Sequence, residues 1–459
     1  MSVLALASHA ELSSLSEEYA KSLLAIKTAN FEGFNMDSLP EYLKKHLELN
    51  QAVPLIVSDE FLAHYEKLSA DVGALLLEVP RRYASKDIEF AARFYGFNNH
   101  EKAYNALVKF SSYDTDMYRL DLINSDDGFK VLEVNMGGAA SGFYGSAWLE
   151  LYSVLPYSKP FLEKHQKSLH TPDTVDIFFR HTLEQSASLA EVQKTKQINY
   201  GLKVPEGQGP QVEKYLADYI AHIAGEYGLV GTITSYPEHE KMEMRDGFVY
   251  LGDTRVDVYV KASGGVNEAL YETFKLNNVL IYDGVSGFFS GDKRNMALAT
   301  SERVDEYYTQ EEREIFDKYV PWTAIITSEG LKYKDQTVDP VTLAIENKDL
   351  FVFKDADSHS GKNVFVGRFM EQEEWAQTIN EYADCSNWIL QKYAESKPYI
   401  FLDNELGFVD HEVVWGSFII AQTAAGGTLR MKPCKTTDGV VNFSRNATES
   451  LFCSLKDIG

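Results

Sequence analysis

The sequence predicts a mixed α/β (α+β) fold with a helical N-terminal region, and three patterns along the chain indicate it. Residues 1–112 read mostly as helices, residues 117–135 alternate apolar and polar side chains around a turn, and helices then alternate with short apolar strands. The 459 residues, 44% of them hydrophobic and 24% charged, suffice for two or three units with sizeable cores.

Four segments follow from these patterns. They are a helical region over 1–112, a hairpin and glycine-containing loop over 113–165, an α/β unit over 166–290, and a mixed unit over 291–459. The first segment is expected to contain helices at 17–26 and 87–110. Within the second, MYRLDLINSDDGFKVLEVN predicts a β-hairpin, because period-two alternation flanks a Ser-Asp-Asp-Gly turn.

The later segments alternate in the manner of α/β proteins. Helices are predicted at 174–189 and 211–227 and short strands at 229–234 and 256–260. The last segment is expected to contain one helix and four strands, at 350–354 (strand), 371–382 (helix), 388–393 (strand), 413–422 (strand) and 428–432 (strand).

The charge balance limits the partners. Asp and Glu number 68 against 44 Lys and Arg, which gives a net charge of −24. So acidic a surface argues against nucleic acid or an anionic membrane as the main partner, because both require a basic face. A local anion site built from a few lysines, arginines and backbone amides remains compatible with this charge.

Other features point to a cytoplasmic protein. No run of about 18 apolar residues predicts a membrane span. The N-terminal stretch has no basic segment before its apolar start, and so predicts a helix and not a signal peptide. Cys385, Cys434 and Cys453 fit neither a metal-binding nor a disulfide spacing, which favours reduced thiols.

The predicted hairpin carries the first group of candidate site residues: Arg119, Asp121, Glu133 and Asn135. Residues two apart on a strand share a face, so each pair lies on one face, and the hairpin could bring all four together. Two carboxylates, an amide oxygen and a guanidinium suit Mg²⁺ with bound phosphates. A solvated outer face is the competing interpretation. The small residues after Asn135 favour a ligand, because they let it approach the backbone closely.

A second candidate follows the apolar strand LFVF. The segment KDADSHSGKN, from Lys354 to Asn363, places a lysine at the end of a buried strand and Gly361 in a flexible loop, which can hold phosphates. A P-loop is excluded, because Ala356 and Asn363 stand where glycine and Ser or Thr are required. A plain surface turn is the alternative.

The C-terminal part supplies weaker signals. WILQKYAES is an apolar strand that ends in polar residues, a pattern that can present backbone groups to an adenine edge. Arg430 and Lys432 are two apart and share a strand face. The trio Asp410, His411 and Glu412 is interpreted as ordinary surface, because neighbouring residues on a strand alternate faces. No nucleophile motif is present.

Taken in order, these segments resemble the circularly permuted ATP-grasp ligases, whose best-known members are glutathionylspermidine synthetase and the eukaryotic-type glutathione synthetase. LEVN precedes the nucleotide loop, as in the permuted branch. The segments RLDL…DGFKVLEVN, RDGFVYLGDTRVDVYVKAS, KDADSHSGKNV and NELGF are similar to successive family motifs, over about 119–446. The resemblance implies a permuted ATP-grasp fold with a pre-ATP-grasp α/β domain at 166–290 and nucleotide-binding subdomains at 291–459.

The resemblance also implies roles for single residues. Asp121, Glu133 and Asn135 would hold two Mg²⁺ ions against the phosphates of ATP, and Arg119 would stabilise the acyl phosphate. Arg430 would bind the substrate carboxylate, and Ser141 would contact the acyl substrate. The nucleotide would contact Lys293, Lys354, Gly361, Asn363, Gln391, Lys392, Tyr393, Glu405 and Lys432.

The implied activity is ATP-dependent amide formation between a small-molecule or peptide carboxylate and an amine. His359 and Ser360 replace the Arg-Glu of the family's glycine loop, and Asp355 replaces its proline. This departure motivates a non-catalytic nucleotide- or peptide-binding relative as the alternative, and a phosphotransferase is a weaker one. Related ligases are often dimers, so a homodimer is a further expectation. Residues 1–112 are expected to shape substrate choice.

Overall fold

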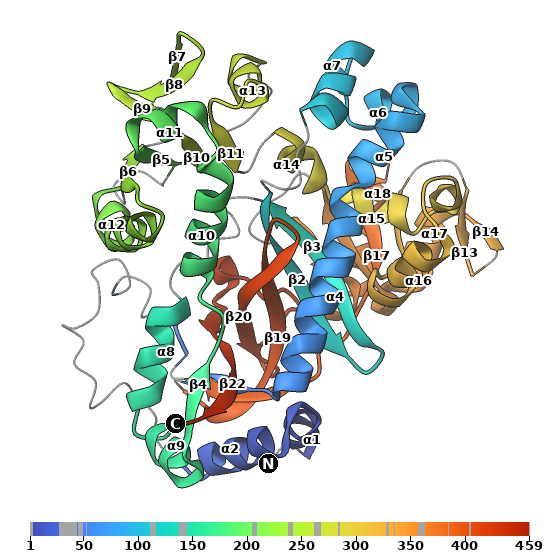
Figure 1. Cartoon of the computed structure of the whole chain (residues 1–459). Helices are drawn as coiled ribbons and strands as arrows, with labels where there is room; N and C mark the ends of the chain where they lie inside the picture. Colours follow the sequence, from blue (N-terminus) through green and yellow to red (C-terminus); the bar gives the residue numbers. More distant parts are fainter. Residues whose placement is uncertain are drawn as a thin grey trace.

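A six-stranded antiparallel sheet lies at the centre of the chain (Figure 1). In spatial order its strands are β21 (Thr448–Ser450), β20 (Thr423–Pro433), β19 (Gly407–Ile420), β2 (Met117–Ser125) and β3 (Gly128–Met136), with β18 (Tyr399–Asp403) paired to the first half of β19. The computed structural model describes residues 3–26, 44, 49–51, 53–110, 116–136, 145–203, 209–236, 242–260, 268–282, 285–326, 330–334, 336–356, 363–383, 385–403 and 405–458.

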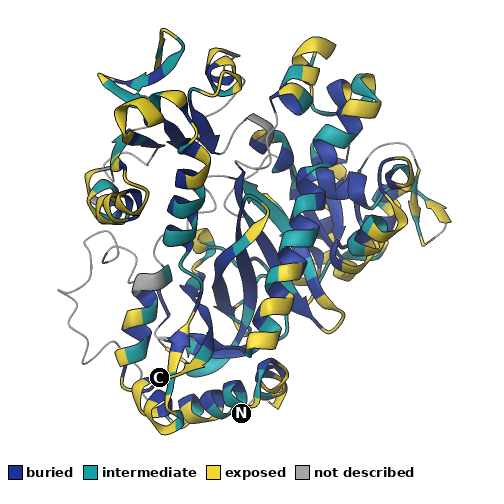
Figure 2. Cartoon of the chain, in the orientation of Figure 1, coloured by how far each residue is buried: buried dark blue, intermediate teal, exposed yellow. Residues whose placement is uncertain are grey.

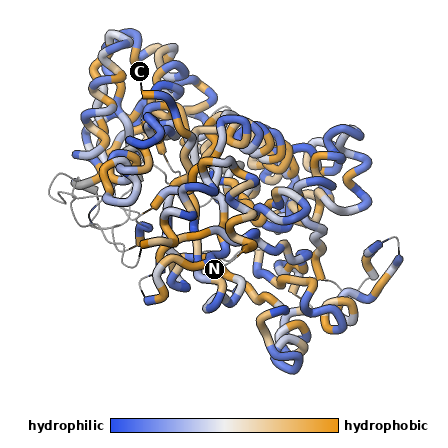
Figure 3. Tube along the Cα trace, turned by 90° about the horizontal axis from the view of Figure 1, so that it is seen from below, coloured by the Kyte–Doolittle hydropathy of each residue, from blue (hydrophilic) through white to orange (hydrophobic). Residues whose placement is uncertain are grey.

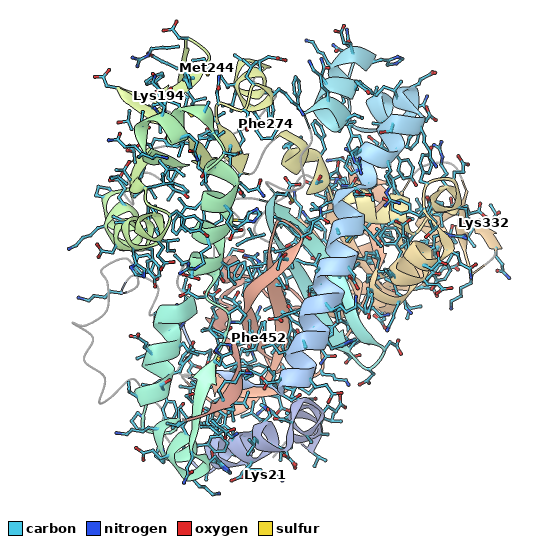
Figure 4. The ribbon with its side chains drawn as sticks, in the orientation of Figure 1. Lys21, Lys194, Met244, Phe274, Lys332 and Phe452 are labelled. Atoms are coloured by element: carbon cyan, nitrogen blue, oxygen red, sulfur yellow. The ribbon has the colours of Figure 1, made fainter. Side chains whose placement is uncertain are left out.

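The main core lies between one face of this sheet and helix α4 (Asp59–Leu77), which crosses it (Figure 1). The Ser58 side chain caps α4 by accepting a hydrogen bond from the Phe61 amide. Trp415, which is fully buried, is surrounded by the aromatic rings of Phe61, Tyr65, Phe129, Tyr399 and Phe452. The strands are mostly buried (Figure 2), and Phe452 points into this core (Figure 4).

A smaller antiparallel sheet packs beside the central one. Its order is β12 (Thr323–Ile325), β17 (Trp388–Lys392), β15 (Phe351–Asp355) and β16 (Val364–Val366). Helices α17 (Pro340–Glu346) and α18 (Gln372–Tyr382) cover it, through a core that includes Phe353 and Trp375. A two-stranded ribbon, β13 (Leu331–Tyr333) and β14 (Gln336–Val338), is attached to this unit.

A parallel sheet forms a third unit, in the order β11 (Leu280–Tyr282), β10 (Val258–Val260), β5 (Gln197–Lys203) and β6 (Val230–Tyr236). The crossover helix α12 (Gly209–Glu226) joins β5 to β6, and α10 (Thr174–Ser186) packs into the same core. A small ribbon of β7 (Glu243–Arg245), β8 (Phe248–Leu251) and β9 (Thr254–Val256) lies beside it.

A three-stranded sheet joins the N-terminal region to the C-terminus, in the order β1 (Leu55–Ile56), β22 (Phe452–Asp457) and β4 (Lys167–His170). The remaining helices are α1 (Val3–Leu12), α2 (Ser14–Leu24), α5 (Val79–Lys86), α6 (Ile88–Phe94), α7 (His100–Tyr104), α8 (Gly145–Val154), α9 (Lys159–His165), α11 (Ala190–Thr195), α13 (Glu268–Lys275), α14 (Val285–Ser290), α15 (Arg294–Ala299) and α16 (Gln310–Tyr319). Short 3-10 turns lie at Glu302–Glu306, Lys348–Leu350, Gly367–Phe369 and Phe443–Arg445, and a π-helical turn at Asn105–Lys109.

The structure confirms the mixed α/β class, the hairpin, and the helices and strands expected after residue 166, with shifts of a few residues at their ends. The expectation of a continuous helix at 87–110 is wrong. Gly96, with φ of +77°, ends α6, and the Asn99 side chain begins α7 by accepting a hydrogen bond from the Lys102 amide.

Hydrophilic and hydrophobic residues alternate in short stretches along the trace (Figure 3). Among the described residues, none of the helices combines the length and the apolar character that crossing a bilayer would require.

Replacing Trp415 by Ala should lower the free energy of unfolding by about 3–5 kcal/mol, because it leaves a cavity inside the aromatic cluster. Urea unfolding followed by circular dichroism measures the change. Tyr104→Ala is the matched control: this side chain is 48% exposed, and its loss should change stability by about 0.5 kcal/mol. Equal losses in the two variants would contradict the packing described here.

Candidate active site

The hairpin brings its four predicted side chains to one face of the central sheet. Arg119 lies directly opposite Asn135, and Asp121 lies directly opposite Glu133, in the β2–β3 register. The register shifts immediately after Asp121, where Leu122 pairs with Val131. The predicted clustering of these residues on one face is therefore confirmed.

The Asp121 carboxylate is the centre of this group and is 1% exposed. Arg119 donates from Nε to Oδ1 at 2.6 Å and from Nη2 to Oδ2 at 3.2 Å, and Asn135 Nδ2 donates to Oδ2 at 2.8 Å. Arg430, on β20, also donates from Nη2 to Oδ2. One buried carboxylate thus holds two guanidinium groups that come from opposite ends of the sequence.

A glycine on the strand between them makes this contact sterically feasible. Gly416, on β19, pairs with Asp121 on one side and with Thr428 on the other. A Cβ atom at Gly416 would lie 2.8 Å from Arg119 Cδ, closer than carbon atoms approach without a clash. The absence of a side chain lets Arg119 lie against the sheet surface.

The charges around Asp121 decide its protonation. Burial raises the pKa of this carboxyl, but the nearby Arg119 and Arg430 guanidinium groups outweigh that effect and lower the pKa to about 2. Asp121 is therefore ionised at neutral pH, and the pair of arginines leaves the group with a net positive charge.

Two lysines approach the same face from other elements. Lys354, at the end of β15, is buried and donates from Nζ to Gln391 Oε1 at 2.7 Å and to the Leu132 carbonyl at 3.5 Å. Lys293 lies at the N-terminus of α15, with Nζ 3.5 Å from Glu133 Oε2. Burial lowers the pKa of Lys354 to about 8, and Lys293 also lowers it, while Glu133 opposes the shift.

Asp121, Glu133, Lys293, Lys354 and Arg430 line one part of a cavity between the central and the small sheet, here called its inner end, whereas Arg119 and Asn135 do not line it. The central sheet contributes Asp121, Glu133, Glu412 and Arg430 to its wall, and the small sheet contributes Lys354, Gln391 and Lys392. The rest of the wall is mainly apolar and includes Ile123, Leu132, Val352, Val364, Val366, Tyr393, Val413, Val414, Val440 and Val441. The cavity therefore has an apolar part and a cationic end.

Lys432, a further C-terminal residue predicted to contact the nucleotide, does not line the cavity. Lys432 Nζ contacts Asp438 Oδ1 at 2.8 Å, and Arg445 Nη1 contacts Asp438 Oδ2 at 2.7 Å. Burial raises the pKa of Asp438, but the hydrogen bonds from these two cations lower it to about 2. The predicted common face of Arg430 and Lys432 is confirmed by their pairing with Val414 and Glu412.

Two predicted nucleotide contacts lie elsewhere. Glu405 lies in the exposed turn between β18 and β19, where its amide donates to Asp403 Oδ1. Asn363, with φ of 52°, donates from Nδ2 to Asp355 and does not line the cavity. Gly361, Ser141 and the pair at 359–360 lie outside the described residues.

The backbone at the end of β17 is already engaged. The Lys392 amide donates to the Trp322 carbonyl and the Tyr393 amide to the Leu350 carbonyl, each at 2.8 Å. Both residues nonetheless line the cavity. Their N–H groups serve the sheet, so they are not directed at a ligand.

Sequence reasoning missed Glu412, which lines the cavity. Glu412 on β19 pairs with Lys432 on β20. Burial raises the pKa of its carboxyl, and Thr437 Oγ1 donates to Oε2 at 2.6 Å. The interpretation of residues 410–412 as ordinary surface is wrong, because His411 is 1% exposed and faces the core. The alternation of faces, which argued against a metal trio, does hold, because Glu412 lines the cavity and His411 does not.

Oxygen atoms of Asp121, Glu133 and Asn135 are the candidates for holding a metal ion. Among the described residues, no cluster of three or more His, Cys, Asp or Glu is placed to hold a metal ion, so an amide oxygen would have to take part. Glu133, whose side chain is 29% exposed, and the Asn135 amide oxygen are available for this role. Asp121 Oδ1 accepts a hydrogen bond from Arg119 Nε at 2.6 Å, and a carboxylate oxygen can accept another partner.

No protein-family model matches the chain, and a search of curated proteins gives no match. Among solved structures, it is similar to a glutathione synthetase-like effector, GSS30, from Globodera pallida in its apo form. The two chains are 12% identical, with a TM-score of 0.54 over 95% of this chain and 96% of that one. The chain therefore has a glutathione synthetase-like fold, and at this identity the likeness extends to the fold alone.

Asp121→Asn should lower the free energy of unfolding by about 3–5 kcal/mol at neutral pH, because it leaves two buried guanidinium groups without their carboxylate. The native pKa lies below the unfolded value, so the stabilisation is present above about pH 4 and is lost as the pH falls toward 2. Urea unfolding at a series of pH values should show the two proteins converging over that window.

Asp126→Asn is the control for this experiment, because that side chain is fully exposed in the hairpin turn. Its stability should match that of the unmodified chain throughout. An Asp121→Asn variant that is as stable as the unmodified chain at pH 7 would disprove the proposed electrostatic role.

Proposed function

We propose that the chain is an ATP-dependent carboxylate–amine ligase of the circularly permuted ATP-grasp type. The observation that carries the proposal is the charge at the inner end of the cavity. Three cations that line the cavity, Lys293, Lys354 and Arg430, surround two carboxylates, and Arg119 contacts one of these, Asp121, in a chain whose net charge is −24. Such a local excess of positive charge favours a polyanion. The apolar part of the same cavity suits a nucleobase.

The fold and the motif order support the same class. The glutathione synthetase-like fold is consistent with ATP-dependent ligation, and the LEVN strand precedes the lysine loop as in the permuted branch. In such a reaction ATP supplies a phosphoryl group, which turns a carboxylate into an acyl phosphate. The amine then attacks the acyl carbon, loses a proton and displaces phosphate, so the products are an amide, ADP and phosphate.

The residues of the chain would divide this work. Lys293 and Lys354 would neutralise phosphate charge, and Arg119 and Arg430 would stabilise the carboxylate as it becomes phosphorylated. Asp121, Glu133 and Asn135 would hold Mg²⁺, which shields the transferring phosphoryl group. Tyr393 and the valines would enclose the base, and the Glu412 carboxylate suits the ribose hydroxyls.

A specific observation favours a second candidate, a non-catalytic nucleotide- or peptide-binding protein. The structural neighbour is a glutathione synthetase-like effector, and His359 and Ser360 replace the Arg-Glu of the ligase loop. Product analysis separates the two functions. A ligase releases ADP and phosphate together with an amide from mixed carboxylates and amines, whereas a binding protein releases none of them.

ATP with Mg²⁺ should raise the melting temperature by several degrees, because a ligand at about 100 times its Kd stabilises the folded state by about 2.7 kcal/mol. Glu133→Gln should remove the Mg²⁺-dependent part of this rise, since it removes a carboxylate that the metal requires. Differential scanning fluorimetry with ATP, with and without Mg²⁺, measures both effects.

Glu163→Gln is the matched control, because Glu163 is 66% exposed on α9 and forms only a surface ion pair with Lys159. It should respond to ATP as the unmodified chain does. An unmodified chain that shows no shift at millimolar ATP would contradict the nucleotide site altogether.

ATP binding should take up protons from solution near pH 8.5. The pKa of Lys354 is about 8 in the free protein, and a bound phosphate raises it by favouring the charged ammonium. Isothermal titration calorimetry in buffers of different ionisation enthalpy should report an uptake of about half a proton or more. Lys354→Met should abolish most of this uptake, and an unchanged value would contradict contact between Lys354 and phosphate.

A further inference from the structure

Gln391 lies in the cavity wall, where β17 contacts β15, β12 and α15. It is 1% exposed, on the central strand β17 of the small sheet. Its Oε1 accepts the hydrogen bond from Lys354 Nζ at 2.7 Å. Its Nε2 donates to Thr323 Oγ1 at 3.2 Å, and Met296 Sδ lies at 3.5 Å. Both ends of the buried amide are therefore fixed.

The anchoring partners hold this amide in one orientation. Thr323 Oγ1 donates to the Pro321 carbonyl at 2.8 Å, so it can only accept from Gln391. This places the amide nitrogen toward Thr323 and the amide oxygen toward Lys354. The series of hydrogen bonds thus runs in one direction, from Lys354 through Gln391 and Thr323 to the Pro321 carbonyl, just before β12.

The group that accepts the hydrogen bond from Lys354 is uncharged, and this matters for anion binding as much as its position does. Within the described part of the chain, both hydrogen-bond acceptors of Lys354 Nζ are uncharged oxygens, those of Gln391 and Leu132. A carboxylate at position 391 would form an ion pair and cancel the lysine charge locally. An amide oxygen fixes the ammonium and leaves its positive charge available for an anion in the cavity.

The same amide contacts the helix that begins at the second lysine. Met296 lies in the first turn of α15, and Lys293 occupies the N-cap position of that helix. Lys293 and Lys354 repel each other, which contributes to the lowered pKa of Lys354. Gln391 contacts Lys354 directly and contacts α15 through Met296. It can therefore hold the two ammonium groups on the same side of the cavity against this repulsion.

We infer that Gln391 is a positioning residue, which aims Lys354 at the phosphate end of the cavity without forming an ion pair with it. The inference rests on the proposed function, because it names the role of one residue in that nucleotide site. It differs from the contact expected from the sequence, which concerned the backbone of 391–393 and the adenine ring. Here the side chain acts, and it acts on phosphate binding through Lys354.

A double-mutant cycle tests this role. Gln391→Met, Lys354→Met and the double variant are compared in their Kd for Mg²⁺–ATP and for adenosine, by calorimetry, after their melting temperatures show that they fold. Gln391→Met should weaken ATP binding about tenfold and leave adenosine binding unchanged. The double variant should bind ATP no more weakly than Lys354→Met alone. Gln310→Met, on exposed helix α16, is the matched control and should change neither Kd.

Two further variants keep the inference falsifiable if Gln391→Met does not fold. Thr323→Val removes the anchor of the amide nitrogen and should produce a smaller loss of ATP affinity that is likewise absent in the Lys354→Met background. Gln391→Glu preserves the acceptor but neutralises Lys354, so it should also weaken ATP binding without affecting adenosine. ATP binding by Gln391→Glu that equals that of the unmodified chain would overturn the requirement for an uncharged acceptor.

The remaining outcomes separate the inference from the proposed function. Equal losses for ATP and adenosine would make Gln391 a purely structural residue, and additive losses in the double variant would show that it acts independently of Lys354. If Lys354→Met weakens ATP binding and Gln391→Met does not, the inference falls and the nucleotide site stands. If the unmodified chain binds no ATP, both fall together.

Discussion

A carboxylate buried between two guanidinium groups is the constraint on which the candidate site depends. Asp121 fixes the directions of Arg119, from its own strand, and of Arg430, from a strand more than 300 residues later. Because a buried charge without partners is costly, the three side chains require one another. One carboxylate cannot neutralise two arginines, however. The interaction that holds the strands in register therefore also leaves positive charge at the cavity, and an anion there would complete the balance.

One face of the central sheet packs in the main core, and the other face carries the charged residues of the candidate site. Trp415 packs into the aromatic core beside α4, while its neighbour Gly416 faces the other way and makes room for Arg119. Strand alternation allows both within two residues. The small sheet then brings Lys354 to the edge of the same polar face. A rigid core can thus support a group of charges that would be unstable on a flexible loop.

The hairpin could be predicted from the sequence, because alternation and a turn signal are local. The opposition of Asp121 and Glu133 could not, because it depends on the register shift between Asp121 and Leu122; an unbroken register from the turn would pair Asp121 with Leu132. The position of Glu412 could not. It depends on where β19 turns into β20, and positive φ angles at Ala421 and Gln422 form that turn without a glycine that would have marked it. A motif match therefore favours Glu405, whereas the register places Glu412 at the cavity. The side-chain role of Gln391 also depends on three separate elements and has no local signal.

The likeness to an effector and the retained charges bear on different parts of the function. Fold similarity at 12% identity says little about chemistry, since one fold can host catalysts and binding proteins alike. The charges are more informative, because buried lysines and arginines cost stability unless a ligand or a partner repays them. Among the described residues, the buried Lys354 ammonium donates to uncharged acceptors alone. A purely structural protein would gain stability by replacing such a lysine with an apolar residue. Its presence supports the proposed anion site, whether or not amide formation follows.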